Sequence, residues 1–143
     1  MSLPAELAEI AEDFNAMPEN ERLELLLEFS DNLPELPARY ADADLERVEE
    51  CQSPVFLTVE VAQDGDRTVG VFITAPREAP TTRGFAGVLT EGLHGLSAAE
   101  VLAVPDDFPS MLGLTRAVSP LRLRGMSAML GRIKRRVALE VRA

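Results

Sequence analysis

The sequence VFLTVEVA at residues 55–62 places Val or Leu at every second position, which is the period of a β-strand with one buried face. Asp-Gly follows at 64–65 and is typical of a tight turn between antiparallel strands. Residues 69–73 then alternate again, with Val, Val and Ile at every second position. We therefore predict an antiparallel hairpin over 54–74, and residues 44–50 are a candidate third strand.

Helical spacing of apolar residues surrounds this hairpin on both sides. Gly84 and Gly87 predict close packing of one helix against a neighbour. The order of helices, strands and helices indicates an α+β fold. We expect a single domain over 1–143, in which a small curved antiparallel sheet of about three strands packs against flanking N- and C-terminal helices. The predicted helices span about 3–14, 18–32, 80–93, 97–103 (with a Ser-x-x-Glu capping box) and 120–139.

The chain is strongly acidic, and its charge is unevenly placed. It has 14 Lys and Arg residues against 24 Asp and Glu residues, a net charge of −10. Binding to a phosphate backbone draws most of its affinity from Lys and Arg, so we expect no nucleic-acid function. Half of the basic residues lie within 122–143, beside the single acid Glu140. This predicts a basic helix along an acidic body, either as a solvated face or as a docking surface for an acidic partner patch.

Several classes of site are disfavoured by what the sequence lacks. One cysteine cannot form an internal disulfide, and His94, the single histidine, cannot build a metal site alone. There is no phosphate-binding glycine motif and no G-x-S-x-G motif. The apolar runs are too short to span a membrane, and the N-terminus has no signal-peptide pattern. We expect a cytoplasmic protein without a membrane segment, a metal or a cofactor of its own, in which His94 is a structural or surface residue.

The candidate reactive residue is Cys51, which lies in the sequence VEECQSPVF at residues 48–56. Its polar and proline neighbours indicate a loop between the candidate third strand and the hairpin. A free cysteine is often a buried small hydrophobe, whereas loops concentrate binding and catalytic groups. On these residues alone both roles are open.

Four motifs, in the same order along the chain, resemble the SufE family of sulfur-acceptor proteins (the Fe–S metabolism associated domain). The cysteine motif of that family, V-x-G-C-Q-S-x-V-[W/F], is matched at residues 48–56 except that Glu50 replaces the glycine. The resemblance extends over about residues 15–135. The other three motifs are LPEL at 33–36, TRGF at 82–85 and SPLRLRGMSAM at 119–129.

This resemblance implies a sulfur carrier. Cys51 would accept persulfide sulfur from a SufS-like cysteine desulfurase, and the protein would stimulate that enzyme and relay the sulfur to an iron–sulfur scaffold complex. The pyridoxal phosphate would belong to the desulfurase. Gln52 and Ser53 would support the cysteine loop, while Arg83 and Arg122 would bind partner carboxylates, brace the loop or be solvated helix residues. We expect a monomer, because a carrier must present its loop to another protein.

Glu50 keeps a second hypothesis open. Its carboxylate would disfavour the thiolate of Cys51, so the chain could be a non-catalytic regulatory domain that docks on a desulfurase with the thiol chemically idle. A stand-alone thiol enzyme would need a base near Cys51, and no histidine is adjacent in sequence. We expect the partner to activate the thiol, with Val55 and Phe56 shielding it in the free protein.

Overall fold

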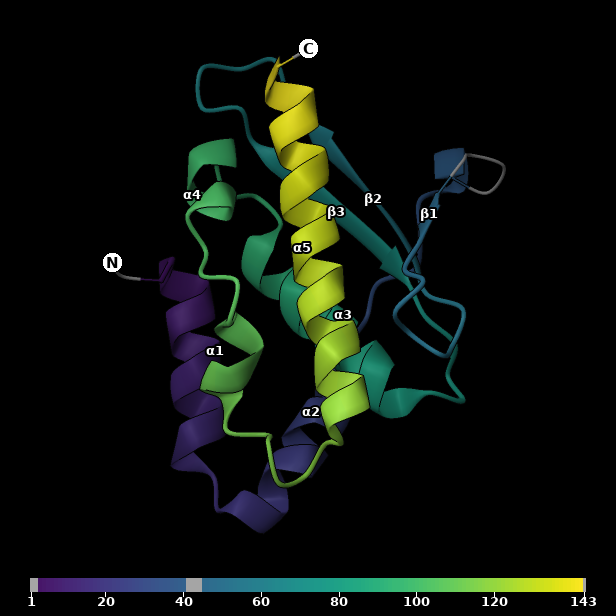
Figure 1. The fold of residues 1–143 in the computed structure, drawn as a ribbon. Helices are drawn as coiled ribbons and strands as arrows, with labels where there is room; N and C mark the ends of the chain where they lie inside the picture. The colour runs from purple at the N-terminus through teal and green to yellow at the C-terminus, as the bar shows by residue number, and fades with distance from the viewer. Residues whose placement is uncertain (1–2, 41–44, 143) are drawn as a thin grey trace.

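The computed structural model describes residues 3–40 and 45–142, and its elements follow the predicted order (Figure 1). The α+β class is confirmed; residues 1, 2, 41–44 and 143 of the predicted domain lie outside the described residues. The α-helices are α1 (Ala5–Ala16), α2 (Arg22–Asp31), α3 (Pro80–Leu93), α4 (Ala98–Leu102) and α5 (Pro120–Arg142). The 3-10 helices are η1 (Glu19–Glu21), η2 (Ala38–Tyr40) and η3 (Phe108–Leu112), and the strands are β1 (Glu46–Arg47), β2 (Phe56–Val61) and β3 (Val69–Thr74).

The sheet is the predicted hairpin with a short strand added at one edge. Its order is β1-β2-β3, and neighbouring strands are antiparallel. The hairpin pairs from Phe56 with Thr74 to Val61 with Val69, inside the predicted range. The candidate third strand forms only over the two residues of β1, and Asp44 of the predicted range lies outside the described residues.

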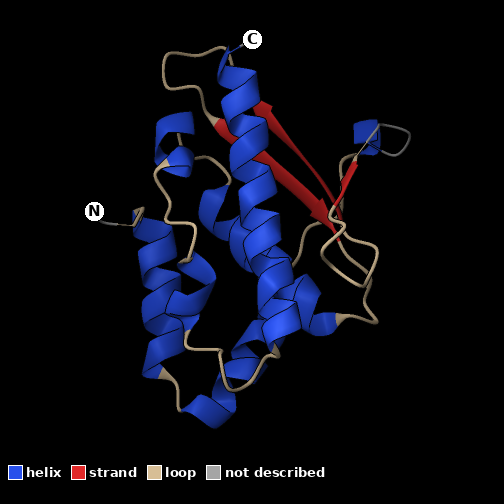
Figure 2. Ribbon diagram, viewed as in Figure 1, coloured by secondary structure: helices blue, strands red, loops and turns tan. Residues whose placement is uncertain are grey.

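One face of the sheet is buried against helices. Leu57 and Val59 on β2 and Val71 and Ile73 on β3 are at most 6% exposed, as the alternation predicts. This face packs against α3 and α5, and α5 runs in front of the strands in Figure 2. The two N-terminal helices reach the core through α3, which both of them contact. The last predicted helix also buries an apolar stripe: Met126, Met129, Leu130, Ile133 and Val137.

Two glycines of α3 allow its backbone to lie directly against that of α2. A Cβ added to Gly84 would overlap the carbonyl oxygen of Leu26, and one added to Gly87 would overlap that of Phe29. The backbones of α2 and α3 therefore touch, which confirms the predicted close packing. An alanine at either position would have to push the helices apart.

The predicted capping box is present, and a second helix start is capped as well. Ser97 and Glu100 form a reciprocal capping box at the start of α4, with hydrogen bonds of 3.0 and 3.1 Å. At the start of α5, the backbone N–H of Arg122 donates to the Ser119 hydroxyl at 3.2 Å. Within the described residues, no helix is long and apolar enough to cross a bilayer.

Candidate functional site

Cys51 lies in the loop that connects β1 to β2, and this loop is closed by its own backbone. The N–H of Val48 donates to the carbonyl of Val55 at 2.9 Å, and the N–H of Cys51 donates to the carbonyl of Val48 at 3.1 Å. Both valines are fully buried, whereas Glu49 and Gln52 at the tip are exposed. The apolar ends therefore anchor the loop in the core, and its polar tip stays at the surface.

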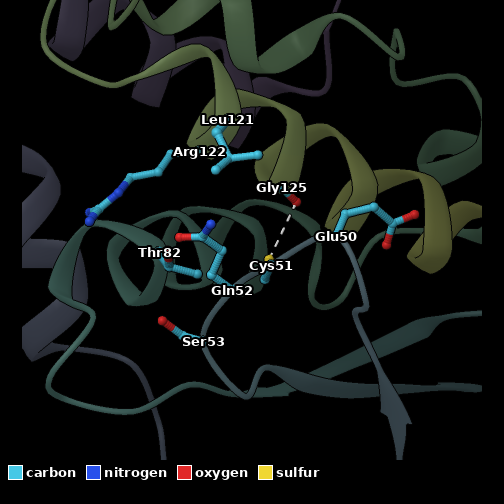
Figure 3. A pocket seen from close by; sticks show the side chains of 8 residues that line it. All are labelled: Glu50, Cys51, Gln52, Ser53, Thr82, Leu121, Arg122 and Gly125. Atoms are coloured by element: carbon cyan, nitrogen blue, oxygen red, sulfur yellow. Dashed lines mark hydrogen bonds between the residues drawn. The ribbon is translucent and has the colours of Figure 1, made fainter.

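The thiol faces α5 across a close backbone contact. Cys51 is 7% exposed, and its Sγ lies 3.8 Å from the carbonyl oxygen of Gly125, a distance at which a thiol is a weak donor (Figure 3). A Cβ added to Gly125 would lie 3.0 Å from this sulfur. The missing side chain at Gly125 is what lets the cysteine loop rest on the helix.

A small pocket of about 40 Å³ opens beside the sulfur (Figure 3). One water-sized atom needs roughly 10–15 Å³ of such space, so the pocket has room for one additional sulfur atom on Cys51. Neither Val55 nor Phe56, the shielding residues we expected, contributes to the wall. The lining residues are Glu50, Cys51, Gln52, Ser53, Thr82, Leu121, Arg122 and Gly125.

Three of the predicted supporting residues share this pocket with Cys51, and one does not. Gln52, Ser53 and Arg122 line it, but their side chains make no hydrogen bond to the described part of the chain. The Arg122 side chain extends away from the sulfur in Figure 3. Arg83 is absent from the lining; it donates to the carbonyl of Ser30 at 2.9 Å and to that of Ala75 at 2.7 Å. Arg83 thus ties the end of α2 to the residue after β3.

Sequence reasoning missed an ion-pair cluster that holds the cysteine loop to α5. Arg132 donates to Glu50 at 2.7 Å and to Glu46 at 2.5 Å. Glu46 also accepts from Arg135 at 2.5 Å and from Arg136 at 3.1 Å. The excess of basic residues after position 122 did signal a helix lying along an acidic body. It could not say which acids these side chains meet.

This cluster also sets the electrostatics of the thiol. Burial raises the pKa of Cys51, the negative charge of Glu50 raises it further, and the positive charge of Arg132 opposes both effects. Hydrogen bonding from Arg132 lowers the pKa of Glu50, so this carboxyl stays ionised at neutral pH. The resting thiol of Cys51 is therefore protonated at neutral pH.

Neither a metal-binding cluster nor a histidine base accompanies the thiol within the described residues. No group of three or more His, Cys, Asp or Glu side chains there is arranged to hold a metal ion. His94 is exposed, and its Nδ1 accepts the N–H of Val71 at 3.1 Å. It lies outside the cysteine pocket, so it supplies no base to the thiol.

Known proteins resemble this chain over most of its length. A SufE family model, described as Fe-S metabolism associated domain, matches residues 8–137. An uncharacterized SufE-like protein of Mycobacterium tuberculosis is 56% identical over 136 residues, which cover 95% of this chain and 94% of that protein. The SufE-like protein 1, chloroplastic/mitochondrial, of Arabidopsis thaliana is 32% identical and covers 98% of this chain, although the match is 37% of the plant protein.

A solved structure agrees with these sequence matches. The solution structure of a hypothetical protein from Thermus thermophilus has a TM-score of 0.85 and 38% identity, covering 99% of this chain and 100% of that one. The predicted family is confirmed on both sequence and fold, and all four motifs lie inside the matched range. The chain therefore belongs to the SufE family of iron–sulfur metabolism.

Proposed function

We propose that this protein is a sulfur carrier that accepts persulfide sulfur from a cysteine desulfurase on Cys51. It stimulates that desulfurase, relays the sulfur to iron–sulfur cluster assembly and needs no cofactor of its own. The observation that carries the proposal is the position of its one thiol, on a surface loop beside a pocket of about 40 Å³ with room for a second sulfur. Membership of the SufE family supports it independently.

The proposed transfer is a persulfide form of thiol–disulfide exchange. The Cys51 thiolate attacks the outer sulfur of the persulfide on the desulfurase. A new S–S bond forms on Cys51 as the S–S bond of the donor breaks, and the donor cysteine leaves as a thiolate that takes up a proton. No oxidant or reductant is consumed, because the oxidised sulfur simply changes carrier.

The burial and the raised pKa of Cys51 support activation of the thiol within the complex with the desulfurase. A buried, protonated thiol is a poor nucleophile, which protects it from oxidation in the free protein. Docking has to swing the loop away from Gly125 or bring a base or a positive charge close to the sulfur. The contact that holds the sulfur, at 3.8 Å, is weak enough to be given up on docking.

The test is intact-mass and peptide mass spectrometry after incubation with a cysteine desulfurase, pyridoxal phosphate and cysteine. We expect a gain of one sulfur atom on the peptide that contains Cys51, reversed by a thiol reductant. Cys51→Ser, which changes one buried atom, is the matched control and should gain nothing. If the wild-type protein gains no mass while the desulfurase is active, the proposal is contradicted.

The raised pKa also favours a second candidate, a regulator that docks on the desulfurase without using its thiol. The Cys51→Ser protein separates the two by desulfurase turnover. A carrier loses all stimulation when its acceptor sulfur is removed, whereas a docking regulator keeps most of it.

A further inference from the structure

A second hollow, of about 520 Å³, lies where the segment after α2 faces α3 and β3. That volume is in the range of ligand sites, and its walls are largely apolar. It shares no lining residue with the cysteine pocket. An occupant here would leave the thiol pocket empty. The apolar side chains that line it are Phe29, Pro34, Pro37, Val71 and Phe72.

The walls of this groove are fixed by contacts already made. Gly87 packs against the backbone of Phe29, which sets the spacing of α2 and α3 at the groove. The imidazole of His94 accepts the N–H of Val71 through Nδ1 at 3.1 Å and meets the ring of Phe72 edge-on, with centroids 5.6 Å apart. Because Nδ1 is the acceptor, the Nε2–H of His94 remains as a donor. The groove is therefore preformed.

The polar groups of the groove favour positive charge. Glu35 and Glu91 both line it, and neither forms an ion pair within the described residues. Partial desolvation raises the pKa of Glu91, and the charges of Glu6 and Glu9 raise it further. A carboxylate in so negative a neighbourhood gains from a cation and repels an anion. Asn32, also in the lining, has a free side-chain amide among the described residues.

We propose that this groove binds an extended segment of a partner protein in which an apolar side chain is followed by a lysine or arginine. The apolar side chain would pack between Phe29 and Phe72, and the basic one would pair with Glu91 or Glu35. The segment's backbone would be bound by the Nε2–H of His94 and the amide of Asn32. A partner held in this way leaves Cys51 free to exchange sulfur, so the inference stands apart from sulfur acceptance.

The test is an NMR titration of the ¹⁵N-labelled full chain with three acetylated peptide amides. The first is Ala-Leu-Ala-Arg; the second replaces Arg with Glu, and the third replaces Leu with Ser. We expect the first to shift the amides of Val71, Phe72, Gly87 and His94 at millimolar concentration, and the other two to bind at least several-fold more weakly. Equal shifts with the Glu peptide, shifts at the Cys51 loop instead, or none with any peptide would overturn the proposal.

A pair of matched variants tests the charge directly. Glu91→Gln should weaken binding of the Arg peptide by about fivefold, which is the contribution of one partly exposed ion pair. Glu24→Gln removes the same charge from an exposed position on α2 that does not line the groove, and should leave the affinity unchanged. Equal affinities in the two variants would overturn the role of Glu91. Both side chains are exposed, so both proteins should fold.

Discussion

Both halves of α5 carry basic side chains, but those at 132–136 in the C-terminal half form ion pairs and those of the first turns form none with the described residues. In the C-terminal half, Arg132, Arg135 and Arg136 all reach Glu46, whose side chain is only 14% exposed. Lys134 is paired as well, with Asp106 at 2.7 Å. These basic side chains bind the helix to the strand and loop beside it.

In the first turns of the same helix, Arg122 and Arg124 are exposed and form no ion pair with the described residues. Leu121 beside them is 42% exposed, although it is a large apolar side chain. Leu121 and Arg122 line the cysteine pocket, so an apolar side chain and a basic residue without an ion pair among the described residues border the thiol site, although the Arg122 side chain extends away from the sulfur.

The comparison separates two uses of positive charge that the sequence could not separate. The basic side chains at 132–136 in the C-terminal half are neutralised by ion pairs within the protein and anchor the cysteine loop. The N-terminal half presents Leu121 at the cysteine pocket and two exposed basic side chains on the same turns, as a surface for an acidic partner would. The variants below are ordered by the size of their expected effect on stability.

Glu46→Ala should have the largest effect, because it removes the acceptor that Arg132, Arg135 and Arg136 share in a partly buried site. We expect a loss of about 2 kcal/mol in the free energy of unfolding, measured in urea. Glu49→Ala is the control: its pair with Arg47 is long, at 4.0 Å, and its side chain is 74% exposed. Equal losses in the two variants would show that Glu46 anchors nothing.

The same cluster predicts how stability depends on pH. Burial raises the pKa of Glu46, but hydrogen bonds from Arg132 and Arg136 and the charge of Arg135 lower it more, so the net shift is downward. Because the folded pKa is below the unfolded one, the stabilisation is complete above the unfolded value and is lost as pH falls through the folded value. Between about pH 5 and pH 3, the wild type should lose more stability than Glu46→Ala. If the free energies of unfolding of the two proteins, measured in urea, fall by the same amount across that range, the predicted direction is wrong.

Gly125→Ala and Gly131→Ala compare the two halves of α5 with the same change. Alanine in place of a helical glycine contributes about 1 kcal/mol, and at Gly131 nothing lies within 4 Å to oppose it. At Gly125 the new methyl group would meet Sγ of Cys51 at 3.0 Å, so the gain should be cancelled and the loop displaced. We expect Cys51 to be alkylated several-fold faster in Gly125→Ala only. Equal rates in both variants would mean that the contact does not hold the thiol.

Glu50→Gln should change stability by less than about 1 kcal/mol, because the Glu50 side chain is 42% exposed. Its effect should be on the thiol. Removing the carboxylate takes away a charge that raises the pKa of Cys51 and leaves Arg132 to lower it, so the midpoint of the alkylation rate against pH should fall. Glu49→Gln is the neighbouring control and should leave the midpoint in place. A midpoint that stays or rises in Glu50→Gln would refute the assignment.

Arg122→Glu should have the smallest effect on stability, within about 0.5 kcal/mol, because its side chain makes no contact that folding needs. If the N-terminal half of α5 meets an acidic partner, this reversal should reduce desulfurase stimulation several-fold in a turnover assay. Arg142→Glu reverses an exposed charge at the far end of the same helix and should leave stimulation intact. Equal stimulation by both variants would make Arg122 a solvated residue.

Local patterns predicted most of the fold. The hairpin, the helix over 80–93 and the capping box of α4 each depend on residues close together in the chain, so spacing alone was enough to find them. The third strand was overestimated because only two of its residues reach β2. Cys51 was found in the same local way, from its polar neighbours and from a motif that is contiguous in sequence.

The sequence by itself determined the period of each element, the identity of the single thiol and the excess of positive charge after position 122. Only the tertiary structure decided that Arg132 meets Glu46, that Gly125 rests on the sulfur and that Arg83 binds the carbonyls of Ser30 and Ala75 instead of lining the pocket. Periodicity is a property of neighbours along the chain. Which distant side chains meet depends on how whole elements pack, because one crossing of α5 over the sheet sets all of its contacts together.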